Sequence, residues 1–302
     1  MRQRLAALAL LSVTALWGST FILIKDLTDR LPVVDFLGVR FAIAALALFI
    51  VSPRAISRLT PEVRRRSAYA GVIYGIAQIL QTIGLTDTSA SVSGFVTGMY
   101  VVATPLLAAA LLRQRIPAAV WIAVGLSTVG LGILSLRGFQ IGFGEAVTLV
   151  GAILYALHIV ALSRWSSPRD AFAMATIQTA VIAAMCLLLA SPGGITLASG
   201  TRDWLAVIYM ALGAGALAML AQTWAQGQLS ASRAALLMTM EPVFAATFAV
   251  VLGNEQLGYA GLVRRRAHPC GHVDRRDDRS TPGPPDRMTA MSTPRIGTQE
   301  ST

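Results

Sequence analysis

The sequence predicts an all-α, polytopic bundle of transmembrane helices that is built from two related halves. Three observations lead to this fold class: the composition, the number of long apolar stretches, and a repeat that relates the first half of the chain to the second. Of the 302 residues, 55% are hydrophobic and 13% are charged, and the mean hydropathy is +0.63. A soluble globular chain carries about 25% charged residues. The expected solvent for the apolar stretches is therefore the lipid bilayer.

The apolar stretches have the length of membrane-spanning helices, since a helix needs about 20 apolar residues to cross the hydrocarbon core. Nine stretches meet this requirement, at 5–24, 34–51, 68–85, 92–112, 118–136, 143–163, 171–190, 204–223 and 234–252. The first continues to Ile24 without a small-x-small cleavage site, so we interpret it as a helix and not as a signal peptide. Many Gly, Ala and Ser residues lie within the stretches, which favours close contact between helix backbones in lipid.

The connections between the stretches divide into a strongly basic set and a weakly basic set. Twelve arginines fall on one side of the membrane: Arg2, Arg4, Arg54, Arg58, Arg64, Arg65, Arg66, Arg113, Arg115, Arg164, Arg169 and Arg233. Four basic residues fall on the other side: Lys25, Arg30, Arg137 and Arg202. Because basic residues gather on the cytoplasmic side of membrane helices, the sequence predicts a cytoplasmic N-terminus in a multi-pass protein of the cell inner (plasma) membrane.

The second half of the chain repeats features of the first half at a nearly constant offset. The tripeptide Ser-Ala-Ser at 89–91 returns at 230–232, which is 141 residues later. Trp17 in the first stretch corresponds to Tyr155 in the sixth, 138 residues later. Each repeat is expected to hold five helices, an odd number, so the second repeat enters the membrane from the opposite side. Inverted repeats of this kind place a binding site near the midplane of the membrane, between the halves.

Three segments carry the most specific motifs of the chain. They are ALWGSTFILIK at 15–25, SASVSGFVTGMYVVATPLLAAALL at 89–112, and SASRAALLMTMEPVFAATFAVVLGNEQL at 230–257. These segments resemble the EamA-domain members of the drug/metabolite transporter superfamily, and the resemblance extends over residues 5–262. It implies ten helices in two inverted five-helix repeats, at 5–137 and 142–262.

The resemblance also implies a function, that of a secondary-active membrane transporter of small polar metabolites, of the amino-acid or metabolite exporter type. Such a carrier would work by alternating access between its two inverted repeats. The expected partners are a small-molecule substrate and the lipid bilayer. Proton coupling is a further expectation, and so is a homodimer, because small-residue faces can pack within one chain or between two chains.

The sequence departs from the family pattern after residue 257, where a tenth helix is expected. Residues 258–262 begin an apolar segment, but the charged sequence 263–302 follows, and a charge at the centre of a membrane helix costs about 3 kcal/mol. We therefore predict a ten-helix design whose tenth helix is lost, with a disordered tail at 263–302. A truncated remnant that no longer transports is accordingly the alternative function.

A frameshift is our hypothesis for this tail. If the arginines use CGN codons, removing the first base of the Val263 codon permits the apolar sequence Gly-Ala-Ala-Leu-Ile-Leu-Ala-Gly-Met. Resequencing the gene tests the hypothesis, because a confirmed reading frame without an apolar alternative would leave a natural disordered tail as the explanation.

The sequence lacks the residue patterns of enzymes and of cofactor or metal sites. His158, His268 and His272 are the only histidines, and the two cysteines, Cys186 and Cys270, have neither disulfide nor metal-site spacing. No glycine-rich phosphate loop and no nucleophile-elbow serine occurs. No basic stripe with interleaved aromatic residues occurs either, which argues against a nucleic-acid partner. We expect no catalytic residues, no cofactor and no metal ion.

Ionisable residues inside membrane spans are costly, so each one is a candidate for function. Arg40 in the second stretch could bind an anionic group such as a carboxylate, or it could extend to the interface or pair with Asp35. His158 in the sixth stretch could titrate in a proton-coupled cycle, or it could simply hydrogen-bond a neighbouring helix.

Glu241 stands directly before Pro242 in the ninth stretch. Its carboxyl group could carry a coupling proton, whereas the Glu-Pro step could also be a feature of the fold alone. Proline removes a backbone donor and leaves a carbonyl group free for substrate or water. We therefore predict helix breaks at Pro242 and at Pro105, which occupies a similar place in the first half.

Amide and aromatic side chains complete the candidate cavity. Gln78 and Gln81 lie on one face of the third stretch, and Gln222 lies on the corresponding stretch of the second half. These amides could line one cavity, or they could hold helices together. Trp17 and Tyr100 could stack on a ligand or pack between helices.

Overall fold

The computed structural model describes residues 2–113 and 142–252, together with residues 118, 121, 122, 125, 126 and 129. In this part of the chain every regular element is a helix, and no strand occurs. Eight helical segments are long and apolar enough to cross a membrane, which confirms the predicted all-helical membrane fold. Most of the fifth apolar stretch at 118–136, the segment 258–262 and the tail at 263–302 lie outside the described residues.

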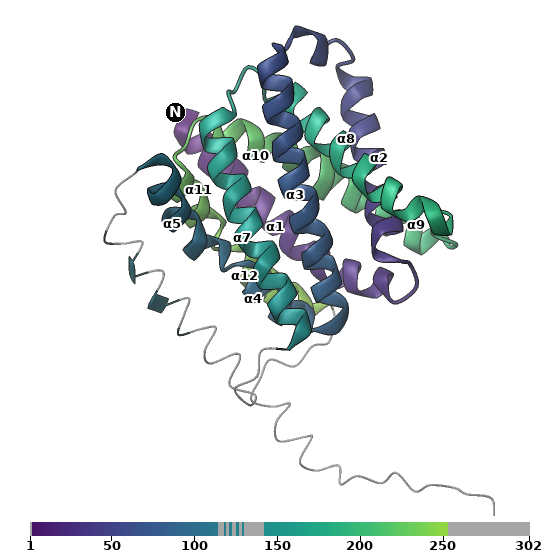
Figure 1. The fold of residues 1–302 in the computed structure, drawn as a ribbon. Coiled ribbons are helices and arrows are strands. Elements are labelled where there is room, and N and C mark those ends of the chain that lie inside the picture. The colour runs from purple at the N-terminus through teal and green to yellow at the C-terminus, as the bar shows by residue number, and fades with distance from the viewer. Residues whose placement is uncertain are drawn as a thin grey trace, which may run out of the picture. The chain divides into compact units, whose positions relative to one another are not determined.

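The helices follow one another in the order drawn in Figure 1. The first half contains α1 (Arg2–Thr28), α2 (Val33–Val51), η1 (Ile56–Arg58), α3 (Pro61–Asp87), α4 (Ala90–Thr97) and α5 (Tyr100–Leu112). The second half contains α7 (Phe143–Trp165), α8 (Ala171–Ala190), η2 (Ser191–Gly193), α9 (Thr201–Tyr209), the π-helix η3 (Met210–Leu217), α10 (Ala218–Gln226), α11 (Ala231–Met238) and α12 (Glu241–Val251). Four spans are composite: α4 with α5, α8 with η2, α9 with η3 and α10, and α11 with α12.

Hydroxyl side chains fix the starts of two helices. Thr60 accepts a hydrogen bond from the backbone N–H of Val63 (3.3 Å), and Pro61 occupies the first turn of α3, where no N–H group is needed. Ser89 accepts from the N–H of Val92 (3.3 Å) at the start of α4. The second Ser-Ala-Ser tripeptide stands at the start of α11. The repeated tripeptide therefore marks equivalent helix starts in the two halves.

Two spans are interrupted at equivalent positions of the repeat. α4 ends at Thr97 and α5 begins at Tyr100, while α11 ends at Met238 and α12 begins at Glu241. Tyr100 and Glu241 are 141 residues apart, which is the offset of the Ser-Ala-Ser tripeptides. α4 packs on α12, and α5 packs on α11. This exchange of partners is what a two-fold relation between similar units produces.

The interruption in the first half comes earlier in the chain than predicted. Pro105 lies inside α5, so the helix break expected there is wrong. The backbone instead adopts 3₁₀-type hydrogen bonding around Gly98. The N–H of Met99 donates to the carbonyl of Val96 (3.1 Å), and the N–H of Val101 donates to the carbonyl of Gly98 (3.0 Å). Gly98 faces the ring of Pro242, which stands at the start of α12 directly after the second interruption. The contact between the halves therefore sets the position, and the internal proline does not.

Helices of the two halves approach closely where glycine takes the place of a larger residue. Gly18 of α1 lies against α12, so that a Cβ atom added to it would be 2.8 Å from the backbone nitrogen of Ala245. Gly84 of α3 lies equally close to Gly144 and Thr148 of α7. Figure 1 shows α3 and α7 lying side by side. Close packing of this kind holds helices together in lipid, where the hydrophobic effect does not.

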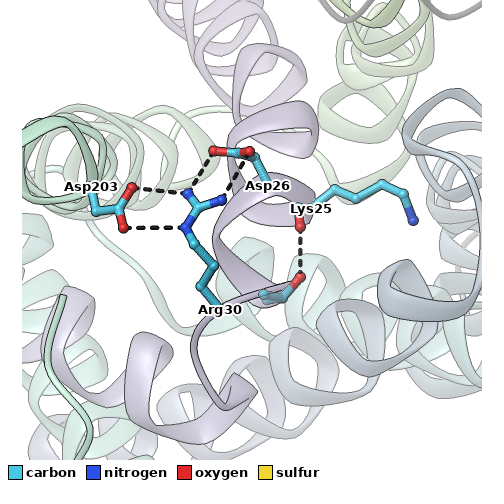
Figure 2. A network of polar contacts seen from close by, with 5 residues as sticks. Lys25, Asp26, Arg30 and Asp203 are labelled. Atoms are coloured by element: carbon cyan, nitrogen blue, oxygen red, sulfur yellow. Dashed lines mark hydrogen bonds and ion pairs between the residues drawn. The ribbon is translucent and has the colours of Figure 1, made fainter. Parts of the chain in front are cut away.

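Polar contacts join the halves at one end of the bundle, which we call the Arg30 end. The guanidinium group of Arg30 lies between Asp26 and Asp203, at 2.8 and 2.9 Å, and so links the end of α1 to α9 (Figure 2). Hydrogen bonds to these two carboxylates, first to Asp26, raise the pKa of Arg30 above its ordinary value. Asp87 at the end of α3 accepts from the N–H of Gly144 at the start of α7 (3.0 Å). The Arg30–Asp203 and Asp87–Gly144 contacts cross from one half to the other.

The opposite end of the bundle, which we call the Arg64 end, is held differently. Among the described residues 2–113 and 142–252, no hydrogen bond or ion pair joins the two halves at the Arg64 end. At the Arg30 end, Lys25 lies near Arg30 but extends away from it in Figure 2. Lys25 donates to the carbonyl groups of Leu85 and Thr88 (3.1 and 2.6 Å), and both contacts stay within the first half. In this conformation the two ends of the bundle therefore differ in their polar contacts.

We predict that Gly18→Ala destabilises the protein by about 1–3 kcal/mol, because the new methyl group forces α1 and α12 apart. Thermal unfolding of the detergent-solubilised protein measures the effect. Gly213→Ala is the matched control, since its methyl group would meet no atom closer than 3.8 Å. Equal melting temperatures for the two variants would contradict the close approach at Gly18.

Candidate functional site

A closed cavity of about 30 Å³ lies between the two halves of the bundle. Spans from both halves line it, and all eight cavity candidates from the sequence are among the lining residues: Trp17, Arg40, Gln78, Gln81, Tyr100, His158, Gln222 and Glu241. A water molecule needs about 10–15 Å³ measured in this way. The cavity therefore has room for two or three water molecules and for no metabolite.

Arg40 of α2 brings a buried positive charge to this cavity. Its side chain is 2% exposed, and its Nε and Nη1 atoms have no hydrogen-bond partner in the described part of the chain. Its guanidinium carbon lies 5.2 Å from the centre of the Phe41 ring. Asp35, the alternative partner considered from the sequence, instead accepts from the backbone N–H of Thr196 (2.7 Å). The cation at Arg40 thus has no anionic partner among the described residues.

Tyr100 and Glu241 meet across the boundary between the halves. The Tyr100 hydroxyl lies 2.8 Å from Oε2 of Glu241 and 2.8 Å from the carbonyl oxygen of Met238. That carbonyl would bond an N–H group four residues later in a regular helix, but the residue there is Pro242, which has none. The proline therefore leaves the Met238 carbonyl without its helical donor, and the Tyr100 hydroxyl of the other half bonds it instead.

A second polar network joins α3, α4 and α7. The Tyr155 hydroxyl lies 3.0 Å from Oε1 of Gln78 and 2.9 Å from Oε1 of Gln81, and the Gln81 amide donates to Thr97 (3.0 Å). The rings of Tyr74 and Tyr155 contact each other, with centres 5.1 Å apart. These amides line the cavity and also hold helices together, so both interpretations considered from the sequence apply to them.

His158 of α7 is bound by its neighbouring helix. Its Nε2 atom lies 2.7 Å from Oε1 of Gln178 in α8, and the Gln178 amide donates to Thr223 (3.3 Å). Nδ1 of His158 and Oε1 of Gln222 are buried without a partner among the described residues. Two lining residues therefore present unused hydrogen-bonding atoms in addition to those of Arg40.

Trp17 is fixed by the π-helix of the second half. Its indole N–H donates to the carbonyl oxygen of Ala214 in η3 (3.0 Å). π-Helices are rare and frequently occur at functional sites. The hydrogen bond joins α1 to η3, so Trp17 lines the cavity and also holds two helices together.

The sequence analysis did not select three residues that the structure places at or beside the site: Tyr74, Tyr155 and Gln178. Tyr155 was noted only as the counterpart of Trp17 in the repeat. Tyr74 lies one helical turn before Gln78, on the same face of α3, so that spacing could have identified it. Gln178 lies within the apolar stretch at 171–190, so the criterion that selected Gln78 could also have identified it. Among the described residues no group of His, Cys, Asp or Glu is arranged to hold a metal ion.

Comparisons with known proteins agree with this architecture. The model of a family described as the EamA-like transporter family matches residues 4–136 and 142–263. An uncharacterized transporter of Archaeoglobus fulgidus is 29% identical over 266 residues, which cover 85% of this chain and 81% of that protein. A crystal structure of another protein aligns with 87% of this chain and 99% of its own, with a TM-score of 0.65 and 19% identity. This last similarity shows the fold alone.

We predict that Arg40→Met increases the free energy of unfolding of the ligand-free protein by about 1 kcal/mol, because the substitution removes a buried charge without a partner. The unfolding temperature should rise accordingly. Differential scanning fluorimetry in detergent measures this. Arg30→Met is the control, since Arg30 is paired with two carboxylates and its loss should not stabilise the fold. A lower unfolding temperature for Arg40→Met would mean that the guanidinium group is compensated.

Proposed function

Because the chain belongs to the EamA-like transporter family, we propose that it is a secondary-active carrier of small polar metabolites, of the amino-acid or metabolite type. The cavity between the halves is its substrate site. The observation that carries this proposal is the set of polar groups from both halves around one closed cavity, with Arg40 buried and unpaired. A permanently empty cavity would give no compensation for that charge.

The proposed substrate carries an anionic group, such as a carboxylate, that binds Arg40. A guanidinium group presents its donors in a planar fork that matches a carboxylate. Unused atoms of His158 and Gln222 offer further hydrogen bonds to a polar substrate. Trp17 and Tyr74 provide aromatic surface beside these groups.

Alternating access accounts for the closed cavity. A cavity of about 30 Å³ holds no metabolite, so the halves must separate at one end to admit one. No described polar contact between the halves lies at the Arg64 end, whereas the Arg30–Asp203 and Asp87–Gly144 contacts hold the Arg30 end together. Interrupted helices beside a midplane site, as in α4–α5 and α11–α12, are typical of secondary transporters.

We expect at least one carboxylate-bearing compound in a panel of L-amino acids, small organic acids and nucleosides to raise the melting temperature of the purified protein. Arg40→Gln should lose this response, and Glu145→Gln should keep it, because Glu145 lies outside the cavity. Counterflow of the labelled compound in proteoliposomes then tests transport. Absence of both responses from a correctly folded protein would favour the non-transporting remnant.

The orientation proposed here places the N-terminus and the Arg64 end in the cytoplasm of a cell with an inner membrane. The arginines of the connections support this choice through their uneven distribution. The Arg30 end then faces outward.

Cysteine labelling of intact cells checks the orientation. In a Cys270→Ser background, Asp29→Cys should react with a membrane-impermeant maleimide, and Ser57→Cys should react only after permeabilisation, since both positions are exposed. The remaining native thiol at Cys186 is buried. The reverse labelling pattern would invert the proposed topology.

A further inference from the structure

The Tyr100 hydroxyl has two acceptors and only one proton to donate. Its oxygen lies 2.8 Å from the Met238 carbonyl oxygen and 2.8 Å from Oε2 of Glu241. A carbonyl oxygen can only accept, and an ionised carboxylate can only accept. If Glu241 were ionised, the two acceptors would compete for the single phenolic proton.

A proton on Glu241 removes this competition and gives both the Met238 carbonyl and the Tyr100 oxygen a donor. Tyr100 then donates to the Met238 carbonyl, which has lost its helical partner to Pro242, and the Glu241 carboxylic acid donates to the Tyr100 oxygen. Burial favours this arrangement, because an unpaired polar group is costly away from water. Glu241 is 4% exposed, and Tyr100 is its only hydrogen-bond partner among the described residues.

We propose that Glu241 is protonated in this closed conformation and that its proton is the coupling ion of transport. This inference rests on the proposed function. Tyr100 and Glu241 occupy equivalent positions of the two repeats and hydrogen-bond across the boundary between them. When the halves separate, Glu241 loses Tyr100 and meets water. The O–H bond of the acid then breaks heterolytically, the electron pair stays on the carboxylate, and the proton passes to water.

The other titratable groups around the cavity do not share this position. Arg40 comes from α2, Tyr74 from α3, and Tyr155 and His158 from α7, while the lining residues of α1, α4, α10 and α11 do not titrate. His158 hydrogen-bonds Gln178 within the second half, so separation of the halves leaves that bond intact. Tyr155 also bonds across the boundary, to Gln78 and Gln81, but these partners are neutral amides, and Glu241 is the acidic residue that lines the cavity.

The charge of the cavity couples the proton to the substrate. With Glu241 neutral, Arg40 is the only formally charged lining residue, and the cavity favours an anionic group. With Glu241 ionised, the cavity has no net charge and attracts an anion less. The proton and an anionic substrate are therefore expected to bind together and to cross the membrane in the same direction.

Infrared spectroscopy tests the protonation without any substrate. The full chain is reconstituted in vesicles of phosphatidylcholine and phosphatidylglycerol at neutral pH. Glu241→Gln should remove the carbonyl stretch of a protonated carboxylic acid, whereas the control Glu145→Gln should leave that band unchanged. Tyr100→Phe should shift the band, because the acid loses its hydrogen-bond acceptor, and this variant serves if Glu241→Gln fails to fold. Loss of carboxylate bands instead of the acid band on Glu241→Gln would overturn the inference.

A transport measurement tests the coupling separately. The probe is the panel compound that raises the wild-type melting temperature most. In proteoliposomes, accumulation driven by a proton gradient should fall at least tenfold in Glu241→Gln, whereas the control Glu145→Gln should accumulate the compound like the wild type. Counterflow should fall by a smaller factor than accumulation in Glu241→Gln, since exchange needs no proton release. Equal gradient-driven accumulation by Glu241→Gln and wild type would refute the role of Glu241. Lack of counterflow by the wild type would instead refute the proposed carrier.

Discussion

The structure depends on one constraint: within a membrane, polar groups must find their partners inside the protein, because the surrounding lipid offers none. Most buried polar side chains of the described residues meet it. Trp17 donates to a π-helix carbonyl, and Tyr155 shares its hydroxyl with two glutamines. Arg40 is the main exception, since two of its donor atoms are buried without a partner. An exception of this kind in an otherwise satisfied interior indicates where a ligand completes the structure.

The same constraint explains why the two interruptions differ in consequence although they are equivalent in position. Both spans are interrupted where the halves meet, directly before the starts of α5 and α12. Only the second interruption is followed at once by a proline, which frees the Met238 carbonyl. The first half provides Tyr100 at that point, and the second half provides Glu241. Divergence between two similar repeats has thus produced a donor on one side and an acid on the other.

Much of this site could be predicted from the sequence, because a polar side chain in an apolar span is conspicuous. Arg40, Gln78 and Glu241 were identified in this way, and the repeat related the stretch that contains Gln78 to the one that contains Gln222. The partners could not be predicted, because they depend on the rotation of each helix about its axis. The π-helix η3 and the choice of Thr196 as the partner of Asp35 are of this kind. The break expected at Pro105 was wrong since helices tolerate an internal proline when packing supports them.

On the proposed function, the separation of the two ionisable residues Arg40 and Glu241 makes closure of the cavity depend on the substrate. Were Glu241 in contact with Arg40, the pair would neutralise itself and the cavity would close equally well with or without substrate. Glu241 bonds Tyr100 instead, and Arg40 keeps no acidic partner among the described residues. Closing the empty cavity then buries an uncompensated cation, which is unfavourable. Closing it around an anion removes that cost, so the charge that makes the empty closed state unfavourable also makes closure depend on the substrate.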